Sequence, residues 1–267
     1  MQFRNAAVIA AGLLISGAAF AGPVVSGFNA NTLARNDDGY TGRVNIGFDI
    51  NFFGNTYSQL YVNNNGNVTF NYGVGSYTPS SLSVLGTVFI SPFFADVDTR
   101  SAGDPVTYGI GSFNGHDAFG VNWVNVDYFK SSTSHAARNS FQLILVDRSD
   151  ISSGDFDIIF NYDSIQWEAG TASGASSATG LGGTAARAGW ASGTGESDEL
   201  PGSGVNGAFI NGGPNALAGM RYTFEVRNGM PPGPPISTPV PEPETWAMLL
   251  AGLGIVGMSA KRRRRQG

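Results

Sequence analysis

The chain has 267 residues, of which 13% are charged, 38 are glycine and none is cysteine. The lack of cysteine excludes cysteine catalysis, cysteine-ligated zinc, iron–sulfur clusters and disulfide bonds. The formal net charge is −5, and six of the fifteen basic residues lie at the two ends. The part between the ends therefore carries roughly −9 to −11 charges, which disfavours nucleic acid as a partner because nucleic-acid binding needs a basic surface.

The N-terminus has the layout of a cleaved secretory signal. Arg4 supplies a positive charge, residues 6–15 form an apolar run too short to span a bilayer comfortably, and Ala19 and Ala21 flank a single residue. Signal peptidase reads such a small–x–small pattern. We expect cleavage after Ala21, which makes Gly22 the new N-terminus; the alternatives are an uncleaved anchor or a buried helix.

The middle of the chain alternates apolar and polar residues with the two-residue period of β-strands. This alternation is clear in residues 46–52, 60–70, 119–123, 141–145, 156–162 and 220–226. Residues 63–66, Asn-Asn-Asn-Gly, predict a hairpin turn because Asn and Gly tolerate positive φ. Residues 87–97 predict a strand buried on both faces, with a bulge or edge at Pro92.

Two glycine-rich stretches predict long surface loops, residues 169–183, which we expect to be mobile, and residues 193–213. The spacing of strands and turns predicts an all-β domain, an antiparallel β-sandwich with long surface loops.

Two blocks of the sequence resemble the nidogen-like, or NIDO, domain. Residues 60–70 (Leu-Tyr-Val-Asn-Asn-Asn-Gly-Asn-Val-Thr-Phe) resemble its opening motif, and residues 90–100 (Ile-Ser-Pro-Phe-Phe-Ala-Asp-Val-Asp-Thr-Arg) match its next block. Segments at 141–145, 156–162, 165–168 and 188–190 fit later strands, so the match runs from about Leu60 to Phe224. The resemblance implies an extracellular domain associated with adhesion and matrix proteins, with no established catalytic residues.

Asp96 and Asp98 are candidate ligands for a cation. Two residues apart on an extended strand, they project to one face, where their carboxylates can share a calcium ion that Asp104 joins from the next loop. The alternative is that they pair with Arg100 or accept backbone hydrogen bonds at a turn. Calcium is the one cofactor that the sequence suggests, and residues 37–39 are interpreted only as a turn.

We predict no catalytic residue. His116 and His135 have no neighbours at metal or triad spacing, and neither a Gly-x-Ser-x-Gly elbow nor a phosphate loop occurs. The alternation around Asp155 and Asp157 predicts a solvated strand face.

The tryptophans are interpreted as core residues, because each adjoins a strand pattern, rather than as a sugar-stacking platform. These are Trp123, Trp167 and Trp190.

The C-terminus combines a linker, a short apolar run and a basic cluster. Residues 230–243 are rich in proline, which favours an extended, semi-rigid linker. As a helix, residues 246–260 would be roughly 22 Å long, below the ~30 Å hydrocarbon core, so insertion requires flanking residues to extend the helix and basic side chains to snorkel. The apolar residues that define this membrane helix are Trp246, Leu249, Leu250, Leu253, Ile255 and Val256. The basic cluster that stays on the cytoplasmic side is Lys261, Arg262, Arg263, Arg264 and Arg265.

Pro241, Glu242 and Pro243, followed by this helix and the arginines, resemble the PEP-CTERM sorting signal. That resemblance implies recognition and removal of the tail by the membrane protease exosortase, in a Gram-negative bacterium that makes extracellular polysaccharide. An ordinary tail anchor is the alternative.

We therefore expect a signal peptide (1–21), a NIDO-like β domain (22–229), a linker with the sorting motif (230–243) and a hydrophobic helix with a basic tail (244–267). The expected product is an exported, non-enzymatic cell-surface or matrix protein that acts in adhesion or binds extracellular polymer. Its expected partners are signal peptidase, exosortase, the inner membrane before processing, and extracellular polysaccharide or surface proteins. The alternatives are a carbohydrate-binding module and a glycoside hydrolase.

Overall fold

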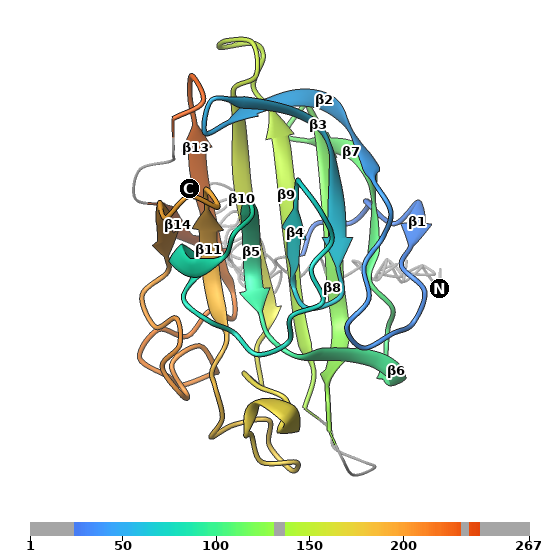
Figure 1. The fold of residues 1–267 in the computed structure, drawn as a ribbon, viewed down its shortest axis with the longest axis vertical. Helices are drawn as coiled ribbons and strands as arrows, with labels where there is room; N and C mark the ends of the chain where they lie inside the picture. Colours follow the sequence, from blue (N-terminus) through green and yellow to red (C-terminus); the bar gives the residue numbers. More distant parts are fainter. Residues whose placement is uncertain (1–23, 131–136, 231–234, 241–267) are drawn as a thin grey trace, which may run out of the picture.

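The computed structural model describes residues 24–130, 137–230 and 235–240. Within these ranges the chain forms an eight-stranded and a six-stranded sheet, with antiparallel pairing throughout (Figure 1). The sheets stack on each other as in a sandwich, and helix is confined to two short 3₁₀ turns in the described part of the chain. The predicted all-β antiparallel class is confirmed.

The larger sheet follows one path of hydrogen-bonded strands, with one further strand attached to β8. In spatial order the path is β1 (Asn31–Thr32), β7 (Thr107–Phe113), β8 (His116–Tyr128), β9 (Asn139–Asp147), β10 (Phe156–Ser164), β13 (Met220–Val226) and β14 (Ile236–Pro239). The further strand is β6 (Val97–Gly103).

The strands of the smaller sheet come from two parts of the sequence, one before β6 to β10 of the larger sheet and one after them. In spatial order these are β12 (Ser197–Glu199), β11 (Arg187–Ala191), β5 (Phe89–Phe94), β4 (Asn67–Thr69), β3 (Asn55–Asn63) and β2 (Val44–Phe52). The 3₁₀ turns are η1 (Leu82–Val84) and η2 (Thr171–Ser173).

The main core lies between the two sheets and is strongly aromatic. Phe52 and Phe93 enter from the smaller sheet, and Trp123 and Phe141 from the larger one, all with no exposed surface. The rings of Trp123 and Phe141 stack with centroids 5.3 Å apart, and the Phe93 ring lies 5.2 Å from that of Phe141. Aromatic packing of this kind adds stability beyond the burial of area.

The two features predicted for the NIDO-like blocks are present. Residues 63–66 connect β3 to β4, and Gly66 has φ +75° with its Cα against the carbonyl of Phe93, where any side chain would collide with that oxygen. Strand β5 is buried on both faces, and its register with β11 shifts between Ser91 and Phe94, around Pro92. Proline cannot donate a ladder hydrogen bond, which accounts for the irregularity there.

Two expectations need correction. Residues 169–183, expected to be mobile, are tied down by backbone hydrogen bonds such as Ser176 N to Leu181 O at 2.8 Å. Asp155 and Asp157, expected on a solvated face, are 1% and 8% exposed, because Asp155 accepts the backbone N–H of Asn228 and Asp157 pairs with two arginines. The proline-rich segment, predicted to be an extended linker, contains β14, which pairs with β13 as an edge strand.

The expected signal helix and C-terminal membrane helix lie outside the described residues. Within the ranges that the structure describes, no helix has the length and apolar character needed to cross a membrane.

A ladder of polar side chains crosses the outer face of the larger sheet. Arg221 Nε donates to Asn161 Oδ1 at 2.6 Å, Asn161 Nδ2 to Gln142 Oε1 at 2.8 Å, and Gln142 Nε2 to Asn122 Oδ1 at 2.7 Å. These residues face one another in register on β13, β10, β9 and β8. Each buried amide thereby finds a partner, as buried polar groups require.

The ladder holds the N-terminal end of the domain against the sheet. The backbone of Val25 exchanges two hydrogen bonds with the Gln142 side chain, at 3.0 and 2.8 Å, and Asn122 Nδ2 donates to the carbonyl of Phe28 at 3.0 Å. The Phe28 ring, 4% exposed, packs over Gly111 and Gly120 in a small apolar cluster outside the main core. We call residues 24–28 the N-terminal arm.

Candidate functional site

Three aspartates from two distant segments meet at one end of the sandwich. Asp37 and Asp38 lie in the loop between β1 and β2, and Asp96 lies in the connection between β5 and β6. Both segments run near the lower right of the view in Figure 1. Each aspartate places one carboxylate oxygen within 4.8 Å of those of the other two. We call these three residues the acidic cluster.

The 63–66 turn positions both segments. Asn64 Nδ2 donates to the carbonyls of Asp37 and Val97, both at 2.5 Å. Asn65 Nδ2 donates to Asp38 Oδ1 at 2.8 Å, and Asn65 Oδ1 accepts the N–H of Val97 at 2.9 Å. The asparagines of the opening NIDO-like block are thus buried clamps that bring the β1–β2 loop to the β5–β6 connection.

The core supports this turn from below. The indole N–H of Trp123 donates to the carbonyl of Asn64 at 2.9 Å, and a hydrogen bond from Phe129 N to Asp96 O, at 3.0 Å, fixes the backbone of the β5–β6 connection. The cluster therefore rests on fully packed backbone rather than on a free loop tip.

Arg100 lies on one side of the cluster. Its guanidinium is bidentate on Asp98, with distances of 3.0 and 2.8 Å, and its Nη2 also contacts Asp37 Oδ2 at 2.9 Å. It stacks over Phe129, 5.5 Å from the ring centroid. Asp98 thus pairs with Arg100, which is the alternative to cation binding given in the sequence analysis.

The electrostatics of the cluster oppose ionisation of Asp96 and Asp37. Burial, followed by the charges of Asp37, Asp38 and Asp98, raises the pKa of Asp96 to about 8, although Arg100 acts in the opposite direction. Burial and the charges of Asp98 and Asp38 raise the pKa of Asp37 to about 6. A carboxyl group whose pKa is raised by burial and by neighbouring carboxylates is a typical feature of a functional site.

The structure arranges the three suspected cation ligands differently from the sequence-based hypothesis. Asp96 is in the acidic cluster, Asp98 is engaged by Arg100, and Asp104 is exposed and accepts a hydrogen bond from Asn125 at 3.2 Å. Sequence reasoning missed Asp37 and Asp38, because Asp-Asp-Gly is typical of any turn and nothing local connects it to Asp96.

The tryptophans considered for sugar stacking are core residues, and His116, considered for metal binding or catalysis, lies at the surface. Trp123, Trp167 and Trp190 are 0%, 0% and 5% exposed, which confirms core packing and leaves no tryptophan platform among them. His116 lies 3.7 Å from Asp150 at the surface, and His135 lies outside the described residues.

Glu168 is a buried carboxylate that fastens a loop. It is 1% exposed, and its two oxygens accept backbone N–H groups of Gly207 and Phe209 at 2.5 and 2.7 Å. Burial raises its pKa, while the two hydrogen bonds lower it. With both oxygens engaged, Glu168 is not poised to protonate a substrate.

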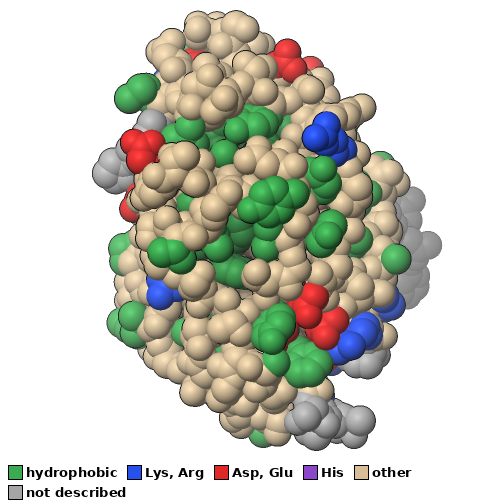
Figure 2. Space-filling view, in the orientation of Figure 1, with side chains coloured by type: hydrophobic (Ala, Val, Ile, Leu, Met, Phe, Trp, Pro, Cys, Tyr) green, Lys and Arg blue, Asp and Glu red, His purple; other side chains and the backbone are tan. Residues whose placement is uncertain are grey.

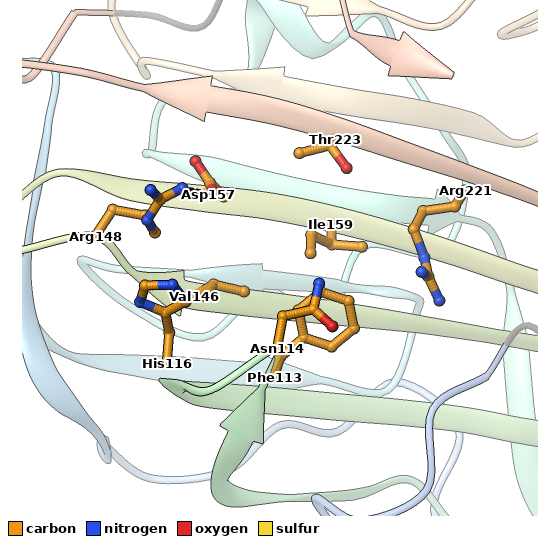
Figure 3. A pocket seen from close by; sticks show the side chains of 9 residues that line it. All are labelled: Phe113, Asn114, His116, Val146, Arg148, Asp157, Ile159, Arg221 and Thr223. Atoms are coloured by element: carbon orange, nitrogen blue, oxygen red, sulfur yellow. Dashed lines mark hydrogen bonds and ion pairs between the residues drawn. The ribbon is translucent and has the colours of Figure 1, made fainter. Parts of the chain in front are cut away.

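A pocket of about 240 Å³ lies on the outer face of the larger sheet, above β7 to β10 and β13 (Figure 3). Arg148 Nη1 contacts Asp157 Oδ2 at 3.0 Å there, and Arg221 lies over the Phe113 ring, 5.3 Å from its centroid. Arg148 and Asp157 are thus paired, Arg221 is engaged by Phe113 and Asn161, and we assign no chemistry to this pocket.

Three exposed tyrosines lie on two loops, one of which also carries Asp37 and Asp38. Tyr40, Tyr72 and Tyr77 are 50%, 51% and 40% exposed. The Tyr40 ring packs against Gly73, so the β1–β2 loop with Tyr40 contacts the segment after β4 that carries the other two tyrosines. Figure 2 shows hydrophobic side chains around the centre of this face and acidic ones beside a basic one at its lower right.

The proposed processing residues fall outside the described ranges. This applies to Ala19, Ala21 and Gly22 at the N-terminus, and to residues 241–267 with the sorting motif, the apolar run and the basic cluster.

Two family models match the chain. The nidogen-like domain matches residues 58–226, and the PEP-CTERM protein-sorting motif matches residues 239–265. The first match begins in β3 and ends at the last residue of β13, so it covers most of both sheets but not the β1–β2 loop.

Comparison with characterised proteins gives similar relatives. The chain is 35% identical to mouse alpha-tectorin and to human alpha-tectorin over 176 residues, which is 58% of this chain and 8% of each relative. It is 28% identical to Drosophila nidogen over 201 residues, 66% of this chain and 14% of that protein. The chain thus matches only a small part of these long relatives, and no solved structure matches it.

Proposed function

Because the chain belongs to the nidogen-like domain family, we propose that it is an exported, non-enzymatic domain that associates with extracellular polymer at a bacterial cell surface. The observation that carries this proposal is the order of the two matches, a NIDO domain at 58–226 followed by a sorting motif at 239–265. A sorting signal behind an extracellular domain would deliver each copy of that domain to the same surface.

The mechanism that we propose is multivalent weak binding. Each domain makes a contact of low affinity, and many domains on one surface raise the effective concentration of the second and later contacts. Such binding requires exposed surface and high copy number more than a preorganised cleft. The engaged carboxylate of Glu168 and the ion pair of Arg148 with Asp157 are in keeping with a domain that does not catalyse.

The sorting signal gives the route. We propose that signal peptidase removes residues 1–21, that the C-terminal helix holds the precursor in the inner membrane, and that exosortase then removes the tail at the PEP-CTERM motif. The basic cluster at residues 261–265 keeps the C-terminus cytoplasmic until then.

The test compares cells that lack the chain with cells complemented by the full chain or by a variant with Pro241, Glu242 and Pro243 changed to alanine. Cells without the chain should retain less extracellular polymer, the full chain should restore retention, and the variant should not. Equal retention in all these cells would contradict the proposal.

A second candidate, a saccharide-binding module, is favoured by the three exposed tyrosines. Aromatic rings at half exposure offer flat apolar faces beside polar groups, and Tyr40, Tyr72 and Tyr77 lie on adjoining loops. A glycan array with wild type and with Tyr72→Ala tests it, with Ile110→Ala as the control at an exposed apolar position on the other sheet. Binding of a defined glycan that Tyr72→Ala weakens at least about tenfold supports this candidate; wild-type binding by that variant contradicts it.

A further inference from the structure

We propose that Asp37, Asp38 and Asp96 bind one calcium ion that joins the β1–β2 loop to the β5–β6 connection. This site goes beyond the surface-association function and does not depend on it, because it concerns how the domain is held together at one end.

The spacing of the oxygens suits one ion. Calcium takes six to eight oxygen ligands at about 2.3–2.6 Å, so two oxygens on opposite sides of it lie roughly 4.6–5.2 Å apart. The three carboxylates each offer an oxygen within 4.8 Å of the others. They can therefore share an ion with small adjustments, and the remaining ligands can be water or the second carboxylate oxygens.

An independent observation points to a missing ligand. Asp96 is 2% exposed, yet its Oδ2 has no hydrogen-bond partner among the described residues. Asp37 Oδ1 is also buried and without a hydrogen bond in the part of the chain that the structure describes. Buried carboxylate oxygens are normally satisfied, because leaving them bare is costly. A cation among the three residues gives both oxygens a partner.

The local charge favours a divalent cation. When all four are ionised, the carboxylates of Asp37, Asp38, Asp96 and Asp98 exceed the charge of Arg100 by three. Arg100 contacts Asp98 and the Oδ2 atom of Asp37. The other oxygen of the Asp37 carboxylate, Oδ1, is the one without a hydrogen bond. A divalent ion in the cluster would reduce the excess to one.

The donor set selects calcium over other metals. The cluster offers carboxylate oxygens and contains neither histidine nor cysteine, a choice that suits hard cations and not zinc or copper. Magnesium requires a smaller, nearly ideal octahedron, whereas ligands from a loop and a strand connection accommodate the larger and more adaptable shell of calcium.

The framework around the site is already in place. Asn64 and Asn65 hold the two ligand-bearing segments through their side chains, as described above. Gly170 leaves room for the Asp96 carboxylate, because a Cβ there would collide with Asp96 Oδ2. The carboxylates are thus brought together before any ion binds, which lowers the cost of ordering them.

The experiment is calcium titration of the purified full chain by calorimetry, together with thermal melts in calcium and in chelator. We expect one ion per chain, and a Tm higher by roughly 5–10 °C at a hundred times the Kd, with a smaller rise in magnesium. No heat of binding and coincident melts would overturn the proposal. A larger rise in magnesium than in calcium would overturn the assignment of the ion.

Variants locate the site. Asp96→Asn and Asp38→Asn should each weaken calcium binding at least tenfold, and Asp104→Asn, an exposed aspartate near the end of β6, should leave it unchanged. Since Asp96 is buried and its variant can fold poorly, the half-buried Asp38 provides the decisive comparison. Wild-type affinity in Asp38→Asn, or loss of affinity in Asp104→Asn, would place the ion elsewhere and overturn the proposal.

Discussion

Phe28 lies directly against the backbone of Gly120, in space that any side chain at position 120 would occupy. The two residues are far apart in the chain, and their contact fixes the N-terminal arm on the outer face of the larger sheet. The arm therefore belongs to the folded domain although it precedes the first strand.

Phe28→Ala should lower the free energy of unfolding by about 3 kcal/mol, because it empties a buried aromatic site. Gly120→Ala should displace the ring and expose residues 24–28 to hydrogen exchange. Val124→Ala, at an exposed position on the same strand, should change stability by less than about 0.5 kcal/mol. Unchanged protection of the arm in Gly120→Ala would contradict this account.

A buried ion network joins the start of β10 to the ends of its two neighbours, β9 and β13. Asp157 contacts Arg148 at 3.0 Å and Arg227 at 2.7 Å, and its side chain is 11% exposed. Asp157→Ala should cost about 3–5 kcal/mol in urea unfolding, since two arginines lose a buried partner. The control is Asp150→Ala, which removes a half-exposed partner of Arg148 and should lower the free energy of unfolding far less, because solvent screens that pair. An equal loss of unfolding free energy in the two variants would show that burial does not distinguish the Asp157 pairs from the Asp150 pair.

The acidic cluster predicts how stability depends on pH when chelator is present. The groups that face Asp96 are Asp37, Asp38, Asp98 and Arg100. The pKa of Asp96 is about 8 in the folded protein, above its usual value of about 3.9, so the folded state binds more protons than the unfolded state between these values. The free energy of unfolding should therefore fall as pH rises from about 4 to about 8.

Asp96→Asn should remove the part of this fall between about pH 6 and about pH 8, and Asp104→Asn should keep it. Urea unfolding across that range measures the slope. A slope that is the same in Asp96→Asn as in wild type would show that another group is responsible.

Much of the fold could be predicted from the sequence, because strands and turns are encoded by residues that are close together in the chain. The two-residue alternation located the main strands, and the Asn-Asn-Asn-Gly turn and the irregularity at Pro92 lie where the sequence places them. The closing strand was expected at residues 220–226, and β13 has those bounds. The edge strand β14 was missed because its proline-rich segment carries no strand alternation.

The site was predictable only in part. Asp96 was singled out, but its neighbours Asp37 and Asp38 reach it through the side chains of Asn64 and Asn65, a long-range arrangement that no spacing along the chain encodes. For Asp157 the alternation gave the correct outward face, but solvation of that face depends on Arg148 and Arg227 from neighbouring segments. The surroundings of Asp96 and of Asp157 both depend on contacts between segments that are far apart in the sequence.

The sorting hypothesis predicts the ends of the mature protein. Surface protein should begin at Gly22 and lack residues 261–265, as measured by mass spectrometry. Alanine in place of Pro241, Glu242 and Pro243 should leave the precursor in the inner membrane, while alanine in place of Pro231 and Pro232, in the same proline-rich segment, should not. An intact basic tail on mature surface protein would exclude exosortase processing.

Retention of the producer's extracellular polymer by the mature protein, immobilised at high and at low density, tests the central claim most directly. At high density the same amount of protein should retain at least about ten times more polymer, because several weak contacts act together. The size distribution of the polymer should stay unchanged after incubation. Retention independent of density, or polymer shortened in a way that a single carboxylate substitution abolishes, would contradict a non-enzymatic, multivalent surface domain.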